Sequence, residues 1–238
     1  MKILVVSDKV DDYIYSPGLK ERMPDVELVF SCGDLPFYYL EFIVSSLNVP
    51  LMYVFGNHHT FEYARDELPG SGPDTASFFG VGGGQGIHRE DQERHIRRAP
   101  EGCVGVDERV VYHNGLLIGG LAGSMRYTLY APYQYTERQM RFKIMRMALR
   151  LAYARLRWGR PLDILIAHAP PYRIHDGRDL AHQGFRAFLA FMDHYNPQYL
   201  IHGHRHIYHL QRPEVTRYGQ TTVINVYGHT LLDVEPQP

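Results

Sequence analysis

The chain has 238 residues, of which 45% are hydrophobic and 13% aromatic, enough apolar material for a sizeable folded core. Its 25 basic residues balance 26 acidic ones, and a net formal charge of −1 does not favour a general nucleic-acid-binding protein. The apolar runs fall well short of the ~20 residues of a membrane span, and the first residues lack the pattern of a secretion signal. Two cysteines, Cys32 and Cys103, form no disulfide framework. We therefore expect a soluble, cytoplasmic, globular protein.

Five short apolar runs are each typical of a β-strand that is covered on both faces. They occupy residues 3–6, 26–30, 51–55, 164–167 and 199–201. Apolar residues at helical spacing in 39–47 and 185–192 predict helices that alternate with the strands. Such alternation favours a layered α/β fold. Without an internal repeat or a Pro/Ser-rich linker, we expect one domain over residues 1–238.

Residues 62–107 differ in composition from the rest of the chain. The glycine-rich stretch GSGPDTASFFGVGGGQG precedes the charge-dense HREDQERHIRR. No GKS or GKT follows the glycines, so the stretch does not resemble a phosphate-binding loop. We expect a long mobile loop, or a lid over a site. Beyond it, residues 110–112 and 116–118 flank a turn and predict a hairpin, and the tail from 207 to 234 predicts a closing antiparallel ribbon.

The longest predicted helix covers residues 136–159, with Thr136 and Gln139 as a capping box and Gly159 at its end. One apolar stripe contains Met140, Ile144, Met147, Leu151, Ala154 and Trp158, and a second contains Met145, Leu149 and Leu156. Because two stripes imply burial on two sides, we expect that this helix can form an interface between copies of the chain. The basic residues between the stripes predict a solvated face, with contact to phosphate or nucleic acid as the alternative.

Each of the five strand-like runs leads into a side chain that can bind a metal ion or a phosphate. These side chains are Asp8, Asp34, Asn57 with His58, His168, and His204 with His206. Ligands of open α/β sheets bind beyond the carboxyl ends of the strands, so these residues can converge. Carboxylate, amide and imidazole groups together suit Mn²⁺, Fe or Zn²⁺ better than Ca²⁺. Each motif alone is a weak signal, whereas their order, each at a strand end, is a strong one.

These blocks resemble those of the calcineurin-like metallophosphoesterase superfamily, which run Asp-x-His, Gly-Asp, Gly-Asn-His-Asp/Glu, a lone His, and Gly-His-x-His. Here they read SDKV at 7–10, CGD at 32–34, GNHH at 56–59, AHAPP at 167–171 and GHRH at 203–206. The resemblance spans essentially the whole chain and implies a sandwich of two β-sheets flanked by helices. It also implies two divalent metal ions, with Asp34 bridging both, Asp8 and His206 on the first, and Asn57, His168 and His204 on the second.

The resemblance implies a phosphoesterase that hydrolyses a phosphomonoester or a phosphodiester through metal-bound hydroxide. His58 matches the family's catalytic histidine, which would protonate the leaving alkoxide or stabilise charge on the phosphate. The expected substrate is a phosphate-ester small molecule or a nucleotide. One alternative is a catalytically weakened protein that keeps the fold to bind a nucleotide or a protein partner. A nuclease that uses the basic helix is a third hypothesis, and we do not favour it.

Two positions depart from the family's pattern. Val10 stands where the family has the histidine of Asp-x-His, so the first metal site lacks a ligand and is expected to be the weaker. His59 stands where an acidic residue usually follows the catalytic histidine. Weaker candidates for contact with the substrate or support of the ligands are His59, Arg126, His175 and His182. For His175 and His182 a loop-capping role, and for Arg126 a surface ion pair, explains the residue about as well.

Overall fold

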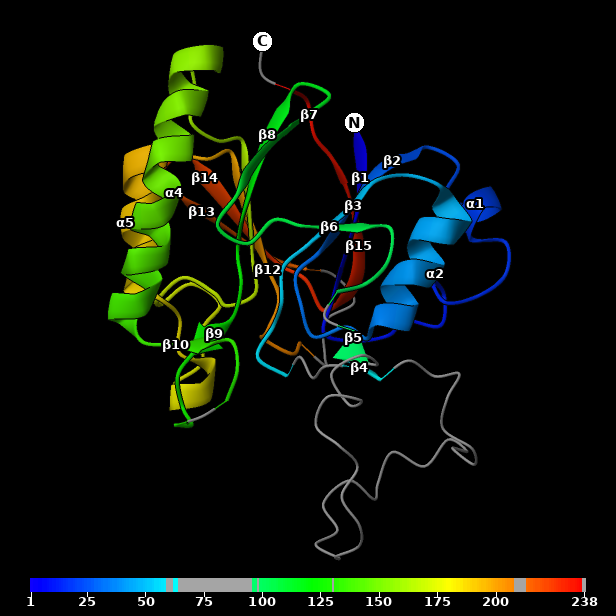
Figure 1. Cartoon of the computed structure of the whole chain (residues 1–238), viewed down its shortest axis with the longest axis horizontal. Coiled ribbons are helices and arrows are strands. Elements are labelled where there is room, and N and C mark those ends of the chain that lie inside the picture. The colour runs from blue at the N-terminus through cyan, green and yellow to red at the C-terminus, as the bar shows by residue number, and fades with distance from the viewer. Residues whose placement is uncertain (59–61, 64–95, 98, 130, 208–212, 237–238) are drawn as a thin grey trace, which may run out of the picture.

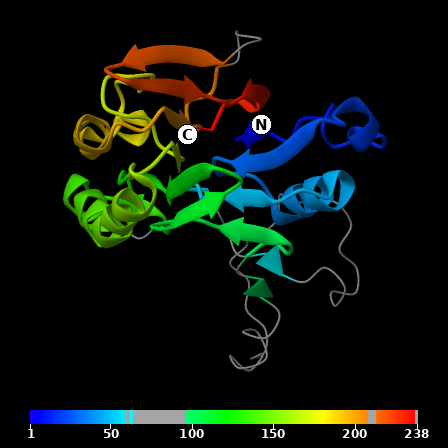
Figure 2. The same cartoon turned by 90° about the horizontal axis from the view of Figure 1, so that it is seen from above.

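The computed structural model describes residues 1–58, 62–63, 96–97, 99–129, 131–207 and 213–236. Two β-sheets lie face to face, and helices cover the outer face of each (Figures 1 and 2). The first sheet has the strand order β15-β1-β2-β3-β6, and the second has the order β13-β14-β12-β11-β8-β7. This confirms the expected α/β fold with two sheets flanked by helices.

The first sheet is built mainly from parallel strands connected through helices. Its strands are β1 (Lys2–Ser7), β2 (Val26–Ser31), β3 (Leu51–Tyr53), β6 (Cys103–Gly105) and β15 (Gly228–Asp233), covered by α1 (Leu19–Arg22) and α2 (Phe37–Leu47). Val6 of β1 pairs with Ser31 of β2, which in turn pairs with Tyr53 of β3. Because these strands end level with one another, the residues after them emerge at one edge of the sheet.

The second sheet contains β7 (Val110–His113), β8 (Leu116–Leu121), β11 (Ile164–Ala167), β12 (Tyr199–His202), β13 (Glu214–Tyr218) and β14 (Thr221–Asn225). Its outer face is covered by α4 (Glu137–Trp158) and α5 (Arg186–Tyr195). Strands β7 and β8 form the predicted antiparallel hairpin. Shorter elements are β4 (Glu62–Tyr63), β5 (Ile96–Arg97), β9 (Ser124–Met125), β10 (Gln134–Tyr135) and the 3₁₀ turn η2 (Leu180–His182).

The expectation for the tail needs revision, and the expectation for the loop at 62–107 falls largely outside the described residues. The tail contains an antiparallel pair, β13 with β14, as expected, but it is not a single ribbon, because β14 also pairs in parallel with β12 and β15 pairs antiparallel with β1 of the other sheet. The buried Val226 lies between β14 and β15 in the core that separates the sheets, so the chain crosses from one sheet to the other there. Of the expected loop at 62–107, the structure describes β4, β5 and residues 99–107, and the lid prediction otherwise lies outside the described residues.

Three apolar layers hold the sandwich together. One lies between the sheets, one between the second sheet and helices α4 and α5, and one between the first sheet and helices α1 and α2. Strands covered on both faces are apolar along their whole length, which explains the continuous runs in the sequence. The thiol of Cys32 is buried in the layer between the sheets. The packing thus leaves the carboxyl edge of the parallel strands as the place where polar side chains gather.

Candidate metal centre

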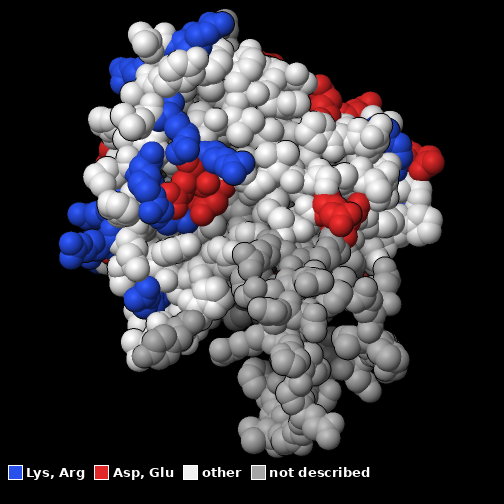
Figure 3. All heavy atoms as spheres, in the orientation of Figure 1, with Lys and Arg blue, Asp and Glu red and all other residues white. Residues whose placement is uncertain are grey.

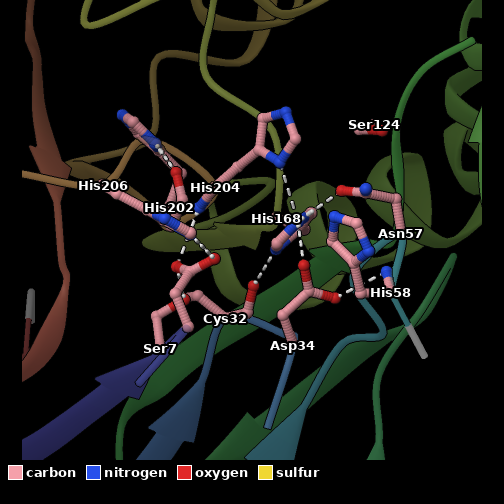
Figure 4. Close-up of polar contacts among 12 residues, drawn as sticks. Ser7, Cys32, Asp34, Asn57, His58, Ser124, His168, His202, His204 and His206 are labelled. Carbon is pink, nitrogen blue, oxygen red and sulfur yellow. Dashed lines mark hydrogen bonds and ion pairs between the residues drawn. The ribbon is translucent and has the colours of Figure 1, made fainter. Parts of the chain in front are cut away.

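Five of the six predicted metal ligands are labelled in Figure 4, where they lie close together beyond the strand ends, and Asp8 joins them through its contacts with His204 and His206. In chain order, Asp8 follows β1, Asp34 follows β2, Asn57 follows β3, His168 follows β11, and His204 and His206 follow β12. They come from both sheets and from nearly the full length of the chain. The predicted convergence of five strand ends is therefore present in the fold.

Three side chains surround the Nε2 atom of His168, which is fully buried. This nitrogen lies 2.9 Å from Asn57 Oδ1, 3.1 Å from His204 Nδ1 and 3.3 Å from Asp34 Oδ2. The ligand atoms of Asp34, His168 and His204 all lie within 4.8 Å of one another. Together with His168, the three are the residues that the family resemblance assigns to the second metal ion.

Backbone carbonyls fix the orientation of both imidazole rings. His168 Nδ1 lies 2.8 Å from the Cys32 carbonyl oxygen, and His204 Nε2 lies 2.7 Å from the Ala181 carbonyl oxygen. A carbonyl only accepts hydrogen bonds, so these two ring nitrogens donate. The opposite nitrogens, His168 Nε2 and His204 Nδ1, face the centre. Metal-binding histidines are commonly oriented by such contacts on the far nitrogen.

The carboxylate of Asp8 is only half satisfied. Its Oδ2 accepts hydrogen bonds from the Ser7 hydroxyl at 2.6 Å and from the His204 backbone N–H at 2.8 Å. Its Oδ1 is buried without a hydrogen-bond partner among the described residues, and His206 Nε2 lies 3.6 Å away. An unsatisfied buried polar atom costs ~1–3 kcal/mol. A cation held by Asp8 and His206 would remove that cost.

The backbone of the centre is strained at its ligands. Asp8, Asp34 and His204 all adopt left-handed conformations, with φ angles of 61°, 55° and 68°. Such a conformation costs a non-glycine residue about 1–3 kcal/mol, and strain of this kind concentrates at functional sites. The neighbouring glycines are required as well. A Cβ atom at Gly56 would overlap the Asp34 carboxylate, and one at Gly203 would overlap Ser7 and Asp8.

The charges of Asp34 and His168 depend on each other. Burial disfavours the charged form of both groups. The attraction of His168 and the hydrogen bond from the His58 N–H at 2.9 Å nevertheless hold the pKa of Asp34 well below its usual range. The Asp34 carboxylate in turn raises the pKa of His168 to about 9. Burial and the nearby His168 lower the pKa of His204 to about 4. Near neutral pH, His204 is therefore already in the neutral form that binds metals.

The donor set fits divalent ions of the transition series. Two carboxylates, one amide oxygen and three imidazoles combine the hard and borderline ligands that Mn²⁺, Fe and Zn²⁺ accept. The unsatisfied Asp8 oxygen and the carbonyl-oriented histidines provide independent support, because both direct ligand atoms toward the centre. We conclude that these residues form a candidate metal centre.

The structure shows what surrounds the residues at the two departures from the family pattern. The half-buried Val10 packs on the apolar layer beneath α2. The carboxylate of Asp11, the next residue along the chain, lies 2.7 Å from His229 Nδ1 and accepts a hydrogen bond from the Tyr13 N–H. His58 is exposed, and its backbone is tied to Asp34. His59 lies outside the described residues.

Three of the four weaker candidates lie within the described residues, and none of them belongs to the group of ligand atoms formed by Asp34, His168 and His204. His182 is 2.8 Å from Asp179, the cap of η2, and its ring centroid lies 5.2 Å from that of His204. His175 contacts His202 at 3.1 Å and the Thr216 hydroxyl at 2.9 Å. Arg126 donates to the Gln139 side chain at 3.0 Å. Asp179 caps η2, and His182, the last residue of that turn, packs against the predicted ligand His204.

Two supporting residues were not found by reasoning from the sequence. Tyr127 accepts a hydrogen bond from Asn57 Nδ2 at 3.0 Å. His202 is fully buried directly before the Gly203–His206 block, and its Nδ1 lies 2.9 Å from the Gly203 carbonyl. The position of His202 at the end of an apolar run was a usable signal. Tyr127 is separated from every ligand block in the sequence and carries no such signal.

Residues 1–208 match the family model described as calcineurin-like phosphoesterase. The chain belongs to the calcineurin-like phosphoesterase family. No relative was found among curated proteins. A similar solved structure is TT1561 of Thermus thermophilus, with a TM-score of 0.55 and 14% identity, over 95% of this chain and 89% of that one. At this identity, the likeness shows that the calcineurin-like fold is shared.

Two further solved structures are more distant from this calcineurin-like phosphoesterase. A single mutant of Vps29 from Entamoeba histolytica has 12% identity and a TM-score of 0.39, over 99% of this chain and 87% of that one. GAP50, described as the anchor in the inner membrane complex of Plasmodium, has 10% identity and a TM-score of 0.44, over 94% and 70%. Within the described part of the present chain, the helices are too short or too polar to cross a bilayer.

Proposed function

We propose that this member of the calcineurin-like phosphoesterase family is a metal-dependent hydrolase of phosphate esters. The observation that carries the proposal is the buried Asp8 Oδ1, which lacks a hydrogen-bond partner in the described part of the chain and lies 3.6 Å from His206, beside the cluster around His168. A fold kept only for docking gains nothing from an unsatisfied carboxylate oxygen and three strained ligand residues. In a centre that holds cations, the carboxylate oxygen binds an ion and the strained backbone directs the ligand side chains toward it.

The ligands divide into two sets in this proposal. Asp34 serves both ions, Asp8 and His206 hold the first, and Asn57, His168 and His204 hold the second. Divalent ions bound there supply Lewis acidity toward phosphoryl oxygens and lower the pKa of coordinated water. Asp8 and Asp34 contribute negative charge that favours dications, and the carbonyls of Cys32 and Ala181 keep the two rings oriented.

His58 is the candidate proton donor. Its backbone N–H donates to Asp34, so the residue is held beside the carboxylate that both sets share, and its exposed side chain remains accessible to a bound ester. A protonated imidazole in this place can give its proton to the leaving alkoxide. The substrate class is a phosphomonoester or phosphodiester of a small molecule or nucleotide.

The second candidate is a catalytically weakened protein that binds a nucleotide or a protein partner. Val10 favours it, because the first set keeps only three protein ligands. A nuclease that uses the basic helix gains no support. Helix α4 begins next to β10 and runs back along the second sheet, away from the strand ends that bear the ligands (Figure 1).

Activity and metal content, measured on the same sample, test the proposal. We expect purified protein loaded with Mn²⁺, Fe²⁺ or Zn²⁺ to hydrolyse p-nitrophenyl phosphate or bis-p-nitrophenyl phosphate. A chelator should abolish turnover, and added metal should restore it. Elemental analysis gives the occupancy. If fully loaded protein turned over neither these esters nor a panel of nucleotides, the binding function would be preferred.

A further inference from the structure

The outer face of α4 carries a line of large apolar side chains that its own chain leaves exposed. These are Phe142, Met145, Leu149, Tyr153 and Leu156, with exposed fractions of 51%, 58%, 82%, 62% and 87%. Their spacing of three, four, four and three residues places them on one side of the helix along about 21 Å. The opposite stripe, which includes Met140, Met147 and Leu151, is buried against the second sheet. Of the two predicted apolar stripes, the one that contains Met140 is therefore buried, and the one that contains Leu149 is left exposed by the described residues.

The exposed line is symmetric about Leu149. Phe142 and Leu156 lie seven residues to either side of it, and Met145 and Tyr153 lie four residues to either side. An interface between two identical chains around a two-fold axis must be self-complementary in this way. Pairing two α4 helices antiparallel at Leu149 sets Phe142 opposite Leu156 of the second copy and Met145 opposite its Tyr153.

The surface on both sides of Leu149 is hollowed. A hollow of about 630 Å³ near the start of the helix is lined by Arg138, Phe142, Met145 and neighbours, and one of about 370 Å³ near its end by Tyr112, Tyr153, Trp158 and neighbours. In the antiparallel pairing, Leu156 of the second copy lies over the first hollow and Phe142 of the second copy lies over the second. Each copy thus offers both the projecting side chain and the hollow that receives its counterpart.

The exposed area agrees with a dimer. The five side chains expose on the order of 600 Å², and with their rim they approach the ~800 Å² that each partner of a stable complex buries. Tyr, Phe, Met and Arg are the residues enriched in the cores of protein interfaces. We propose that this face is the interface of a homodimer, in which two α4 helices pair antiparallel around a two-fold axis at Leu149.

The charges around the stripe set the salt dependence of this dimer. Helix α4 contains seven basic residues and one acidic residue, and Figure 3 shows blue side chains gathered around an acidic patch on this side of the molecule. Lys143 and Arg146 are paired with Asp107 and Glu108 of the same chain. In the dimer, the basic residues of α4 that no acidic residue neutralises lie near the same basic residues of the second copy and repel them. Self-association should therefore tighten as salt rises, whereas binding of an acidic protein, an anionic membrane or a nucleic acid would weaken.

Sedimentation equilibrium of the full chain at 50 mM and 500 mM NaCl tests the interface. We expect a dimer that tightens at the higher salt. Leu149→Asp should weaken it at least about 100-fold, since the axis places two carboxylates together in a desolvated contact. The control Val215→Asp alters a side chain 58% exposed on β13 and should leave the dimer intact. The proposal would be overturned by a monomer at all concentrations, or by a dimer that tolerates Leu149→Asp.

Disulfide trapping tests the register. In a Cys103→Ser background, oxidation of Leu149→Cys should link two copies, because the axis brings residue 149 next to itself. Leu156→Cys alone should not form a link, and Leu156→Cys combined with Phe142→Cys should. Efficient linking of the single Leu156→Cys variant would refute the antiparallel register. None of these residues contributes to the metal centre, so failure of the dimer and failure of the proposed hydrolase are separate outcomes.

Discussion

The side-chain amide of Asn57 is held between two partners. Its Nδ2 donates to the Tyr127 hydroxyl at 3.0 Å, and its Oδ1 lies 2.9 Å from His168 Nε2. Because the amide nitrogen is occupied by Tyr127, the carbonyl oxygen faces the centre. The buried Gln134 accepts hydrogen bonds from the backbone N–H groups of Tyr127 and Thr128, which holds the loop that carries the hydroxyl. Tyr127 thus orients the side chain of Asn57, a predicted metal ligand, without being a predicted ligand itself.

Tyr127→Phe should weaken metal binding at the second set. Without the hydroxyl, Asn57 Nδ2 loses its acceptor and the amide is free to rotate, and losses of this kind commonly cost 10–100-fold in metal affinity. Calorimetric titration of metal into stripped protein measures the change. The control Tyr112→Phe removes a hydroxyl on β7, beside α4 and away from the ligands, and should leave the affinity unchanged. Equal affinities for the natural chain and Tyr127→Phe would show that the hydroxyl is dispensable.

Asp34 and His58 should separate metal binding from proton donation. Asp34→Ala should lose both ions, because one carboxylate serves both sets. His58→Ala should keep the metal and lose about 10²–10⁴-fold in turnover, as expected for a general acid. Elemental analysis and rate measurements on the same samples distinguish the two effects. The assigned roles would have to be exchanged if His58→Ala stripped the metal and Asp34→Ala spared it.

Much of the centre could be predicted from the sequence, because the positions of its residues depend on the order and direction of the strands. The runs at 3–6, 26–30 and 164–167 are apolar throughout, as strands covered on both faces are, and parallel strands deliver the next residue to one edge. The convergence of Asp8 and Asp34 therefore follows from the strands of the first sheet alone, whereas the approach of His168 depends on how the second sheet packs against the first.

The remaining features depend on contacts between distant segments. The left-handed backbone at Asp8 and His204 accompanies a hydrogen bond from the His204 N–H to the Asp8 carboxylate across 196 positions. No local sequence pattern predicts this contact, and none predicts the contact between Tyr127 and Asn57. The division of the tail between the two sheets was not predicted, for a similar reason. The alternating pattern of β15 fits any antiparallel partner, and the free edge of β1 in the other sheet is the partner that accepts it.

Unequal metal affinities should follow from Val10. The first set keeps Asp8, Asp34 and His206, whereas the second is complete, so the first ion should bind at least 10–100-fold more weakly. We expect calorimetry to show two distinct phases. Asp11→Ala should change neither phase, since its carboxylate is engaged by His229 and the Tyr13 N–H. If both sites bound equally tightly in the natural chain and Asp11→Ala weakened one, Asp11 would be the substitute ligand.

The variant Val10→His tests the same prediction by restoring an imidazole at the position where the first set lacks a ligand. Val10 packs half-buried on the apolar layer beneath α2, so the larger imidazole has to leave that layer to reach the centre. Where it does, the weaker phase should tighten toward the stronger one, and the stronger should stay as it was. Val10→Leu keeps the apolar contact and serves as the control, with no gain in either phase. A Val10→His variant that is folded, as judged by its thermal transition, yet shows no gain would mean that position 10 does not face the first ion.

Metal binding at the second set should release a proton from His168. Despite its burial, this residue has its pKa raised to about 9 by Asp34, so the metal-free ring is charged at pH ~7.5. A ligating imidazole must be neutral, and binding therefore displaces the proton. His204, with its pKa lowered to about 4, has none to release at that pH. Calorimetry in two buffers of different ionisation enthalpy should give about one proton for this ion.

The same shift fixes the direction of the pH dependence. Affinity at the second set should rise about tenfold per pH unit from pH ~6.5 to about 9 and level off above. In the metal-free protein, the contribution of charged His168 to the free energy of unfolding is fully present below pH 6.5, the ordinary pKa, and is lost as the pH rises through 9. Chemical unfolding of stripped protein at pH ~6.5 and ~9.5 measures that loss. A metal affinity that stayed flat across this range would show that His168 is already neutral without metal, and that Asp34 does not hold its proton.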